Sequence, residues 1–443
     1  MKKTISILAI ICGLVISSQA QEAKKDSVTK YYRNSLTQLM FYHPEDEFGS
    51  DVYEIFSELP KQDKYDDHDI TLRVIDNSKI SGVAGKPKGG LHRQTYGASM
   101  VLTQAEKNNN AKALLDLINK AEVGKRMVAK WFGFTGETLQ DAHFSTSLIE
   151  ERSDYNASVL DVERARYSVD GMAALQNVSD ELIAHCFVLI SDMTYITAEN
   201  RADATKTTFA VLGGVLDALS GGNAGRRMAE SVGDIADMFT GFKVFTHSYL
   251  YQLEWNDSIA NLFYDKYYTA EPNADRVRAF LEDQTSFKVK YLGNESATYE
   301  KTTTNGNYSR EDLLQMISAR SIDNNVAKLQ KRFDAFRVSA PITSIEYDKK
   351  GNIVGFRALI GEKEGVADDI TYEVMRCVYD KGRLRYDRVA VLKPVKNQIW
   401  DNRFNAIIEN DEDGDNAGTL FKITDKTNAS KVMVGMLIRQ IKG

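Results

Sequence analysis

The sequence is poor in several residues that mark specialised chemistry. Its 443 residues include 3 cysteines, 6 histidines and 6 prolines. With 6 prolines and 29 glycines, no low-complexity stretch dominates the chain. Positive and negative charges are nearly balanced as well, because 56 basic and 62 acidic residues give a formal net charge of −6. A chain built mainly to neutralise phosphates would be basic, so no nucleic acid is expected as a partner.

What remains is an ordinary globular composition. Hydrophobic residues make up 43% of the chain, aromatic residues 10% and charged residues 27%. These values argue against wholesale disorder and against a coiled-coil or collagen-like protein. At about 150 residues per domain, the length predicts roughly three domains.

The first 20 residues have the pattern of a secretory signal peptide. Lys2 and Lys3 precede an apolar run over residues 5–16, and Ala20 completes a small-residue cleavage site before Gln21. The run is about 12 residues long, short of the roughly 20 that a membrane-spanning helix needs. A lipoprotein signal at Cys12 would require a small residue at position 11, which is isoleucine. We therefore expect an exported protein of the periplasm or cell surface, with no transmembrane helix in the mature chain.

Removal of residues 1–20 leaves two cysteines, Cys186 and Cys377. A disulfide between them is permitted in an oxidising compartment. Each lies in its own apolar or strand-like segment, so two separately buried thiols are the simpler expectation.

Residues 21–160 are expected to form an N-terminal α+β region. The stretch 21–65 is polar and aromatic and predicts a loosely helical structure. Residues 69–75 alternate between polar and apolar, as a half-buried strand does. Residues 111–132 carry apolar side chains at helical spacing, which predicts one amphipathic helix with its bend at Gly124.

Residues 161–300 are expected to form a central α/β domain. A helix over 161–185 leads into a buried strand over 186–197, and a second strand covers 242–253. Between these strands, the insert 198–241 shows two apolar helical faces joined by a glycine-rich turn, which predicts a helical hairpin. A helix is expected again from 255 to 268.

Residues 301–443 are expected to combine a helix with a small β domain. Ser309 and Asp312 have the spacing of a capping box, so a helix should begin there and run to about 335. The period then changes to two, with strands expected at the positions that follow and turns between them: 342–347, 353–360, 372–379, 384–395 and 419–423. The whole chain is therefore predicted to be α+β, with an antiparallel, barrel-like C-terminal domain.

Motifs of common enzyme classes are missing from the sequence. Gly85-Lys86 is followed by Pro87, which does not fit a phosphate-binding P-loop, and neither G-x-S-x-G nor H-E-x-x-H occurs. Pairs of carboxylates are frequent, but none is set apart by its context. No catalytic residue and no cofactor-binding residue is therefore predicted, and a non-enzymatic role is favoured.

The best metal candidate is the acidic segment 410–416 (NDEDGDN). Glu409, Asp411, Asp413 and Asp415 would supply the oxygen ligands that Ca²⁺ prefers. An EF-hand register that begins at Glu409 puts Gly414 at the sixth position, but Leu420 stands at the twelfth, where a bidentate glutamate belongs. The alternative is an acidic hairpin loop without an ion.

Two parts of the chain resemble envelope assembly proteins. Residues 188–192 (VLISD), the insert, residues 242–253 and Trp255-Asn256-Asp257 are similar in order to the α/β domain of curli-type secretion channels. The helical pattern of the insert differs from the alternating hairpin strands of a membrane-spanning channel. Residues 361–366 (GEKEGV), 372–374 (YEV) and 388–392 (RVAVL) resemble the small barrel that closes some flagellar and envelope assembly factors.

A closer resemblance extends over the whole chain. Residues 249–257 (YLYQLEWND), 399–403 (IWDNR) and 435–439 (GMLIR) are similar to an uncharacterised family of exported proteins of Gram-negative bacteria. This resemblance implies export and supplies no catalytic residues. We therefore expect a non-enzymatic interaction or assembly protein of the cell envelope, whose partners are envelope proteins or further copies of the chain. The alternatives are a secreted hydrolase with a carboxylate site and a Ca²⁺-dependent surface binder.

Overall fold

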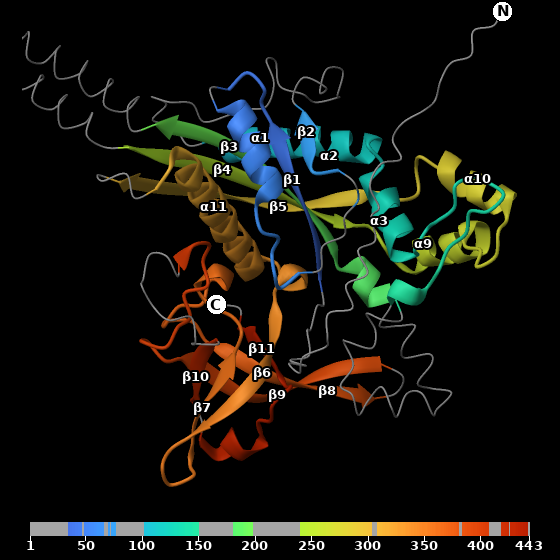
Figure 1. The fold of residues 1–443 in the computed structure, drawn as a ribbon. Coiled ribbons are helices and arrows are strands. Elements are labelled where there is room, and N and C mark those ends of the chain that lie inside the picture. Colours follow the sequence, from blue (N-terminus) through green and yellow to red (C-terminus); the bar gives the residue numbers. More distant parts are fainter. Residues whose placement is uncertain are drawn as a thin grey trace, which may run out of the picture.

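The computed structural model describes residues 34–46, 48–65, 70, 72–76, 102–149, 180–197, 240–303, 308–380, 383–406, 418–424 and 426–441. The predicted signal peptide, residues 1–20, lies outside these ranges. So does the predicted helical insert 198–241, apart from residues 240 and 241, which begin a strand. Figure 1 shows a helix-covered sheet and, next to it, a small barrel.

The larger part is built on a five-stranded mixed sheet with the strand order β2-β1-β3-β4-β5. Its strands are β1 (Ser35–Tyr42), β2 (Val74–Asp76), β3 (Cys186–Thr197), β4 (Thr240–Leu253) and β5 (Val289–Thr303). β1 runs parallel to its neighbours β2 and β3, whereas β4 runs antiparallel to its neighbours β3 and β5. The strands predicted at 186–197 and 242–253 are confirmed. The long polar strand β5 was not predicted.

Helices cover both faces of this sheet. α1 (Gly49–Glu58) and α11 (Arg310–Arg332) share one apolar core with the sheet, to which β1 contributes Leu36 and Met40. The opposite core joins Leu39 and Phe41 of β1 to four helices: α2 (Gln104–Lys120), α3 (Val123–Trp131), α9 (Asp257–Leu262) and α10 (Ala274–Glu282). Because successive side chains of a strand point to opposite faces, β1 serves both cores. The result is a three-layer arrangement of helices, sheet and helices (Figure 1).

β1 corrects the prediction that residues 21–65 are loosely helical. Seven of its eight residues are buried, and the strand lies between β2 and β3 in parallel pairing. Ser35, Thr37 and Gln38 interrupt the apolar run that usually marks a strand buried on both faces. Pairing with two neighbouring strands satisfies the backbone of β1 and outweighs this weak local signal.

The single helix predicted over 111–132 is in fact two helices, α2 and α3. The break lies at Glu122, whose φ of 55° is in the left-handed region that ends a helix. Gly124 lies inside α3 and has a packing role: a Cβ at this position would stand 2.7 Å from the carbonyl oxygen of Phe287. The glycine therefore marks close packing of α3 against the segment before β5.

The C-terminal part is a closed six-stranded barrel with the order β10-β7-β6-β11-β8-β9. Its strands are β6 (Ser339–Tyr347), β7 (Ile353–Ala358), β8 (Tyr372–Asp380), β9 (Arg383–Pro394), β10 (Thr419–Ile423) and β11 (Leu437–Gln440). It has its own apolar core, which includes Phe356, Leu392 and Phe421. The α+β class and the antiparallel C-terminal β domain are confirmed. β11, which closes the barrel, was not predicted as a strand.

Both predicted domain boundaries, near 160 and near 300, are crossed by contacts of the sheet. Strands from the regions 21–160 and 161–300 form one sheet. α11 begins at the capping box predicted at Ser309 and packs on β4, where Asn325 Nδ2 donates hydrogen bonds to Thr246 O and Ser248 Oγ, both at 3.0 Å. This helix therefore belongs to the sheet layer and leads directly into the barrel.

The remaining predictions concern the cysteines and membrane-spanning helices. Cys186 is a buried thiol at the start of β3 and accepts a hydrogen bond from the indole of Trp131, which agrees with the expectation for this cysteine. The side chain of Cys377 lies outside the described part of the structure. None of the helices in the described part of the chain combines the length and apolar character needed to cross a bilayer.

Candidate functional site: a pocket between sheet and barrel

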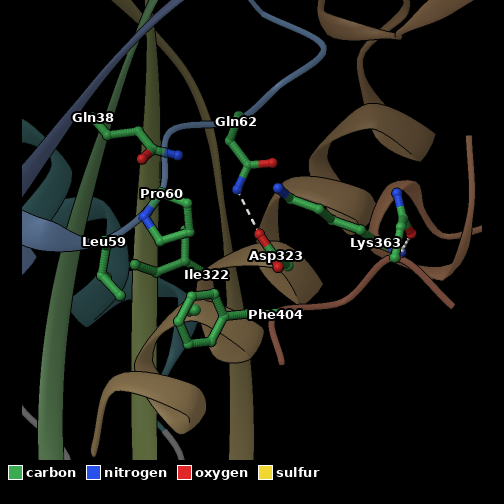
Figure 2. Close-up of a pocket in the computed structure, with 10 residues that line it drawn as sticks. Gln38, Leu59, Pro60, Gln62, Ile322, Asp323, Lys363 and Phe404 are labelled. Carbon is green, nitrogen blue, oxygen red and sulfur yellow. Dashed lines mark hydrogen bonds between the residues drawn. The ribbon is translucent and has the colours of Figure 1, made fainter. Parts of the chain in front are cut away.

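A cavity of about 210 Å³ lies where the sheet layer meets the barrel (Figure 2). The sheet layer contributes residues from β1, from the segment after α1 and from α11. The barrel contributes the turn after β7 and the segment after β9. The lining residues are Gln38, Leu59, Pro60, Gln62, Ala319, Ile322, Asp323, Lys363, Asn402 and Phe404. Both parts of the chain are needed to form this pocket.

Gln38 brings an unused hydrogen-bond donor to the pocket. It lies in β1 on the same face as Leu36 and Met40, and it is 8% exposed. Its Nε2 has no hydrogen-bond partner among the residues that the structure describes. Buried polar groups are nearly always paired, so a buried amide nitrogen left over at the wall of a cavity indicates a place for an acceptor.

Asp323 is a buried carboxyl group on α11, with 6% of its surface exposed. Its Oδ1 accepts a hydrogen bond from Gln62 Nε2 at 2.5 Å. Burial raises the pKa of Asp323 from 3.8 to about 6, because a charged group is poorly solvated there, although Lys363 and the bond from Gln62 act in the other direction. This group therefore changes its charge close to neutral pH.

Lys363 provides the cation of the pocket and comes from the barrel. It lies in a short 3₁₀ turn, η4 (Glu362–Glu364), and its side chain is 11% exposed. Its Nζ donates to Asp63 Oδ1 at 3.1 Å. Burial alone would lower the pKa of Lys363, but the charges of Asp323 and Asp63 outweigh burial and raise it. Figure 2 shows Gln38 and Lys363 on opposite sides of the Gln62–Asp323 pair.

The turn that carries Lys363 is held in place by a second buried carboxyl group. Glu364 Oε2 accepts hydrogen bonds from Gly361 N at 2.7 Å and from Asn402 Nδ2 at 2.9 Å. Burial raises the pKa of Glu364. A Cβ on Gly361 would stand 2.2 Å from Trp400 O, so only glycine permits this close approach. The turn and the segment after β9 therefore form one rigid wall.

The opposite end of that wall is tied to α11. Arg320 donates from Nε and Nη2 to Phe404 O, at 3.0 and 2.8 Å, and from Nη1 to Tyr299 Oη at 2.8 Å. These bonds place the ring of Phe404 beside Ile322 at the apolar side of the pocket. The pocket thus combines apolar side chains with the amide of Gln38, the ammonium of Lys363 and the buried carboxyl group of Asp323.

This arrangement suits a group with an apolar stem and an oxygen acceptor at its end. The volume is below the roughly 300 to 1,000 Å³ of pockets that enclose a whole small molecule. It is larger than the roughly 150 Å³ of a cavity that holds benzene. One side chain of a partner protein fits these limits better than a complete metabolite.

The residues of this pocket were not predicted as a site from the sequence. Lys363 and Glu364 belong to the segment 361–366, whose resemblance to an assembly-factor barrel implies no site. Gln38, Gln62 and Asp323 carry no local motif. The predicted Ca²⁺ ligands Glu409, Asp411, Asp413 and Asp415 lie outside the described residues, so that site stays a prediction.

No protein-family model matches the chain, and no curated protein matches its sequence. The case for function therefore depends on the residues themselves.

Proposed function

We propose that the chain is an exported, non-enzymatic protein of the bacterial cell envelope that works by binding another envelope protein. The pocket between sheet and barrel receives one side chain of that partner, which ends in an amide or carboxylate oxygen. Export is inferred from the signal-peptide pattern of residues 1–20. The partner is a different envelope protein or a further copy of this chain.

The unpaired amide of Gln38 is the observation that carries this proposal. A buried donor without a partner costs about 1 to 3 kcal/mol, and function is a common reason for a protein to retain such a cost. An incoming oxygen would complete the hydrogen bond of this amide. Anchor side chains that fill such pockets contribute most of the binding free energy of many interfaces.

Photo-crosslinking in cells tests where the partner binds. A crosslinking amino acid at position 61, which is exposed next to the pocket-lining Pro60, is expected to form an adduct with an envelope protein. The same amino acid at position 109, exposed on α2 across the sheet, serves as the control and should give no adduct. If position 61 yields only uncrosslinked chain, the proposal is wrong.

The variant Gln38→Met separates binding from folding. We expect the crosslink yield at position 61 to fall by about threefold to tenfold, because the donor to the partner's oxygen is removed. The melting temperature of the purified chain should stay the same or rise, because an unsatisfied buried donor is removed as well. Gln104→Met, on the exposed side of α2, is the matched control for both measurements. An undiminished crosslink with Gln38→Met would contradict the assignment of this residue.

A secreted hydrolase is the second candidate, and one observation favours it. Asp323 has its pKa raised to about 6 at the wall of a cavity, and a carboxyl group with such a pKa can act as a general acid near neutral pH. The test is hydrolysis of glycan, peptide and ester substrates at pH 6. If any is cleaved, Asp323→Asn should lower the rate by about 100-fold or more while the chain still melts cooperatively. No cleavage by the unmodified chain rules this candidate out.

A further inference from the structure

The turn after β1 brings a histidine and two carboxylates together, away from the pocket. His43, Glu45 and Asp46 each offer a ligand atom, and these atoms lie within 4.8 Å of one another. The turn is closed by a hydrogen bond from Asp46 N to His43 O at 3.2 Å. Gly49 packs tightly against it, since a Cβ there would stand 2.7 Å from His43 O. The backbone therefore holds the three side chains on one short turn.

A buried carboxylate orients the histidine. His43 is 5% exposed and Asp192, in β3, is 2% exposed. His43 Nε2 lies 3.1 Å from Asp192 Oδ1. In a neutral imidazole, the nitrogen that faces a carboxylate carries the hydrogen, so the lone pair is on the other nitrogen. Metal-binding histidines are commonly oriented by a carboxylate in this way.

The lone pair of His43 Nδ1 then points at another acceptor. Nδ1 lies 3.4 Å from Glu45 Oε1, which is longer than an ordinary hydrogen bond. Two acceptors at this distance repel each other unless a proton or a metal ion lies between them. In a tetrahedral site with bonds of about 2.1 Å, neighbouring ligand atoms are about 3.4 Å apart. The separation of Nδ1 and Oε1 therefore matches one edge of such a site.

We propose that His43, Glu45 and Asp46 bind a divalent transition-metal ion, with Zn²⁺ as the best fit, and that Asp192 positions the imidazole. An imidazole nitrogen with two carboxylate oxygens suits Zn²⁺, whereas Ca²⁺ and Mg²⁺ prefer oxygen ligands alone. Glu45 has a side chain that is 59% exposed, so an ion can enter from solvent. Three protein ligands leave a fourth position for water. This site uses none of the predicted Ca²⁺ ligands of residues 409–415 and none of the residues that line the pocket.

Titration of the mature chain with ZnCl₂ alone, followed by calorimetry, tests the proposal. We expect one Zn²⁺ per chain at this site, and the single variants Glu45→Gln and Asp46→Asn should weaken it by about tenfold or more. Glu45 is exposed and Asp46 is half-buried on a turn, and both substitutions keep the size of the side chain, so the metal-free variants should melt close to the unmodified chain. Glu54→Gln, on the exposed side of α1, makes the same chemical change without touching the site and should bind as before.

Co²⁺ absorption gives an independent readout of the same site. A four-coordinate Co²⁺ with one nitrogen ligand should show visible bands, and Asp192→Asn should shift them and weaken binding by about 10-fold to 100-fold. Asp411→Asn should leave both unchanged, because it alters only the acidic segment. Zn²⁺ binding that is absent, or that is equal in Glu45→Gln and the unmodified chain, would overturn the proposal. In that case a proton on His43, not a metal, bridges Nδ1 and Glu45.

Discussion

Replacing Lys363 with methionine is expected to lower the free energy of unfolding by about 3 kcal/mol at pH 7. The lysine Nζ lies 3.1 Å from Asp63 Oδ1 and its charge also stabilises ionised Asp323. Methionine keeps the length of the side chain and removes the cation. The buried carboxylate on α11 is then left without its counter-charge, which is among the most destabilising changes a junction of this kind can undergo. Urea unfolding followed by circular dichroism measures the loss.

Two further variants identify the cause of that loss. Asp323→Asn in the Lys363→Met chain should restore much of the stability, because the carboxylate that lost its partner is gone as well. A double-mutant cycle would report this as coupling between the two positions. Lys396→Met is the matched control: its side chain is 81% exposed and lies 3.9 Å from Asp368, so the change should stay within about 0.5 kcal/mol. Equal losses for Lys363→Met with and without Asp323 would contradict the ionic junction.

The Lys363 and Gln38 variants report on different properties of the same pocket. Lys363 joins the barrel to the segment after α1, so its loss should weaken both folding and partner binding. The Nε2 of Gln38 donates no hydrogen bond within the described residues, so the loss of this donor should weaken binding alone. Only the second result distinguishes a binding site from a structural junction.

Structural features that are set by residues close together in the sequence, such as helix starts and alternating strands, could be predicted from the sequence. The capping box at Ser309 depends on a residue three places away, and α11 begins there. The barrel strands alternate with a period of two between turns, and five of the six were predicted near their observed positions. β11 was missed because only four residues, Leu437–Gln440, form it. So short a strand is defined by its pairing with β6 and β8 and not by a pattern of its own.

The strand β1 and the pocket that it lines were both missed from the sequence, and for the same reason. Its polar residues gave no clear strand signal, and one of them, Gln38, is the residue whose amide faces the pocket. A sequence in which Gln38 were leucine would have been easier to recognise as a buried strand. A functional residue in a core strand thus weakens the local pattern that would reveal the strand.

The pocket is also formed by residues that lie far apart in the sequence, so no local sequence pattern could predict it. Gln38, Gln62, Asp323 and Lys363 come from four elements, and only the topology of the sheet and barrel brings them together. The acidic residues around them occur throughout the sequence, so their type alone does not distinguish them. What distinguishes Asp323 is burial, which raises its pKa, and burial follows from the packing of α11 on β4 and against η4. The site is therefore a property of the tertiary structure.

Asp323→Asn is expected to change how stability depends on pH. Because the pKa of Asp323 is about 6 in the fold and 3.8 is its ordinary value, the folded chain keeps this proton between about pH 4 and pH 6, where the unfolded chain has lost it. The stability due to protonated Asp323 is thus fully present below pH 4 and is lost as the pH rises through 6. A difference of about two pKa units corresponds to about 3 kcal/mol.

Asparagine cannot ionise, and its Oδ1 can still accept the hydrogen bond from Gln62. The free energy of unfolding of Asp323→Asn, minus that of the unmodified chain, should therefore rise by about 2.5 kcal/mol between pH 4 and pH 7. Asp63 has the opposite dependence, since Lys64 and Lys363 outweigh burial and lower its pKa, but it is present in both chains and largely cancels. Urea unfolding at half-unit pH steps measures the difference. Asp51→Asn, at an exposed position of α1, removes a carboxylate outside the junction and should lack this slope. A difference that stays constant from pH 4 to pH 7 would show that Asp323 is ionised throughout and that burial does not control its charge.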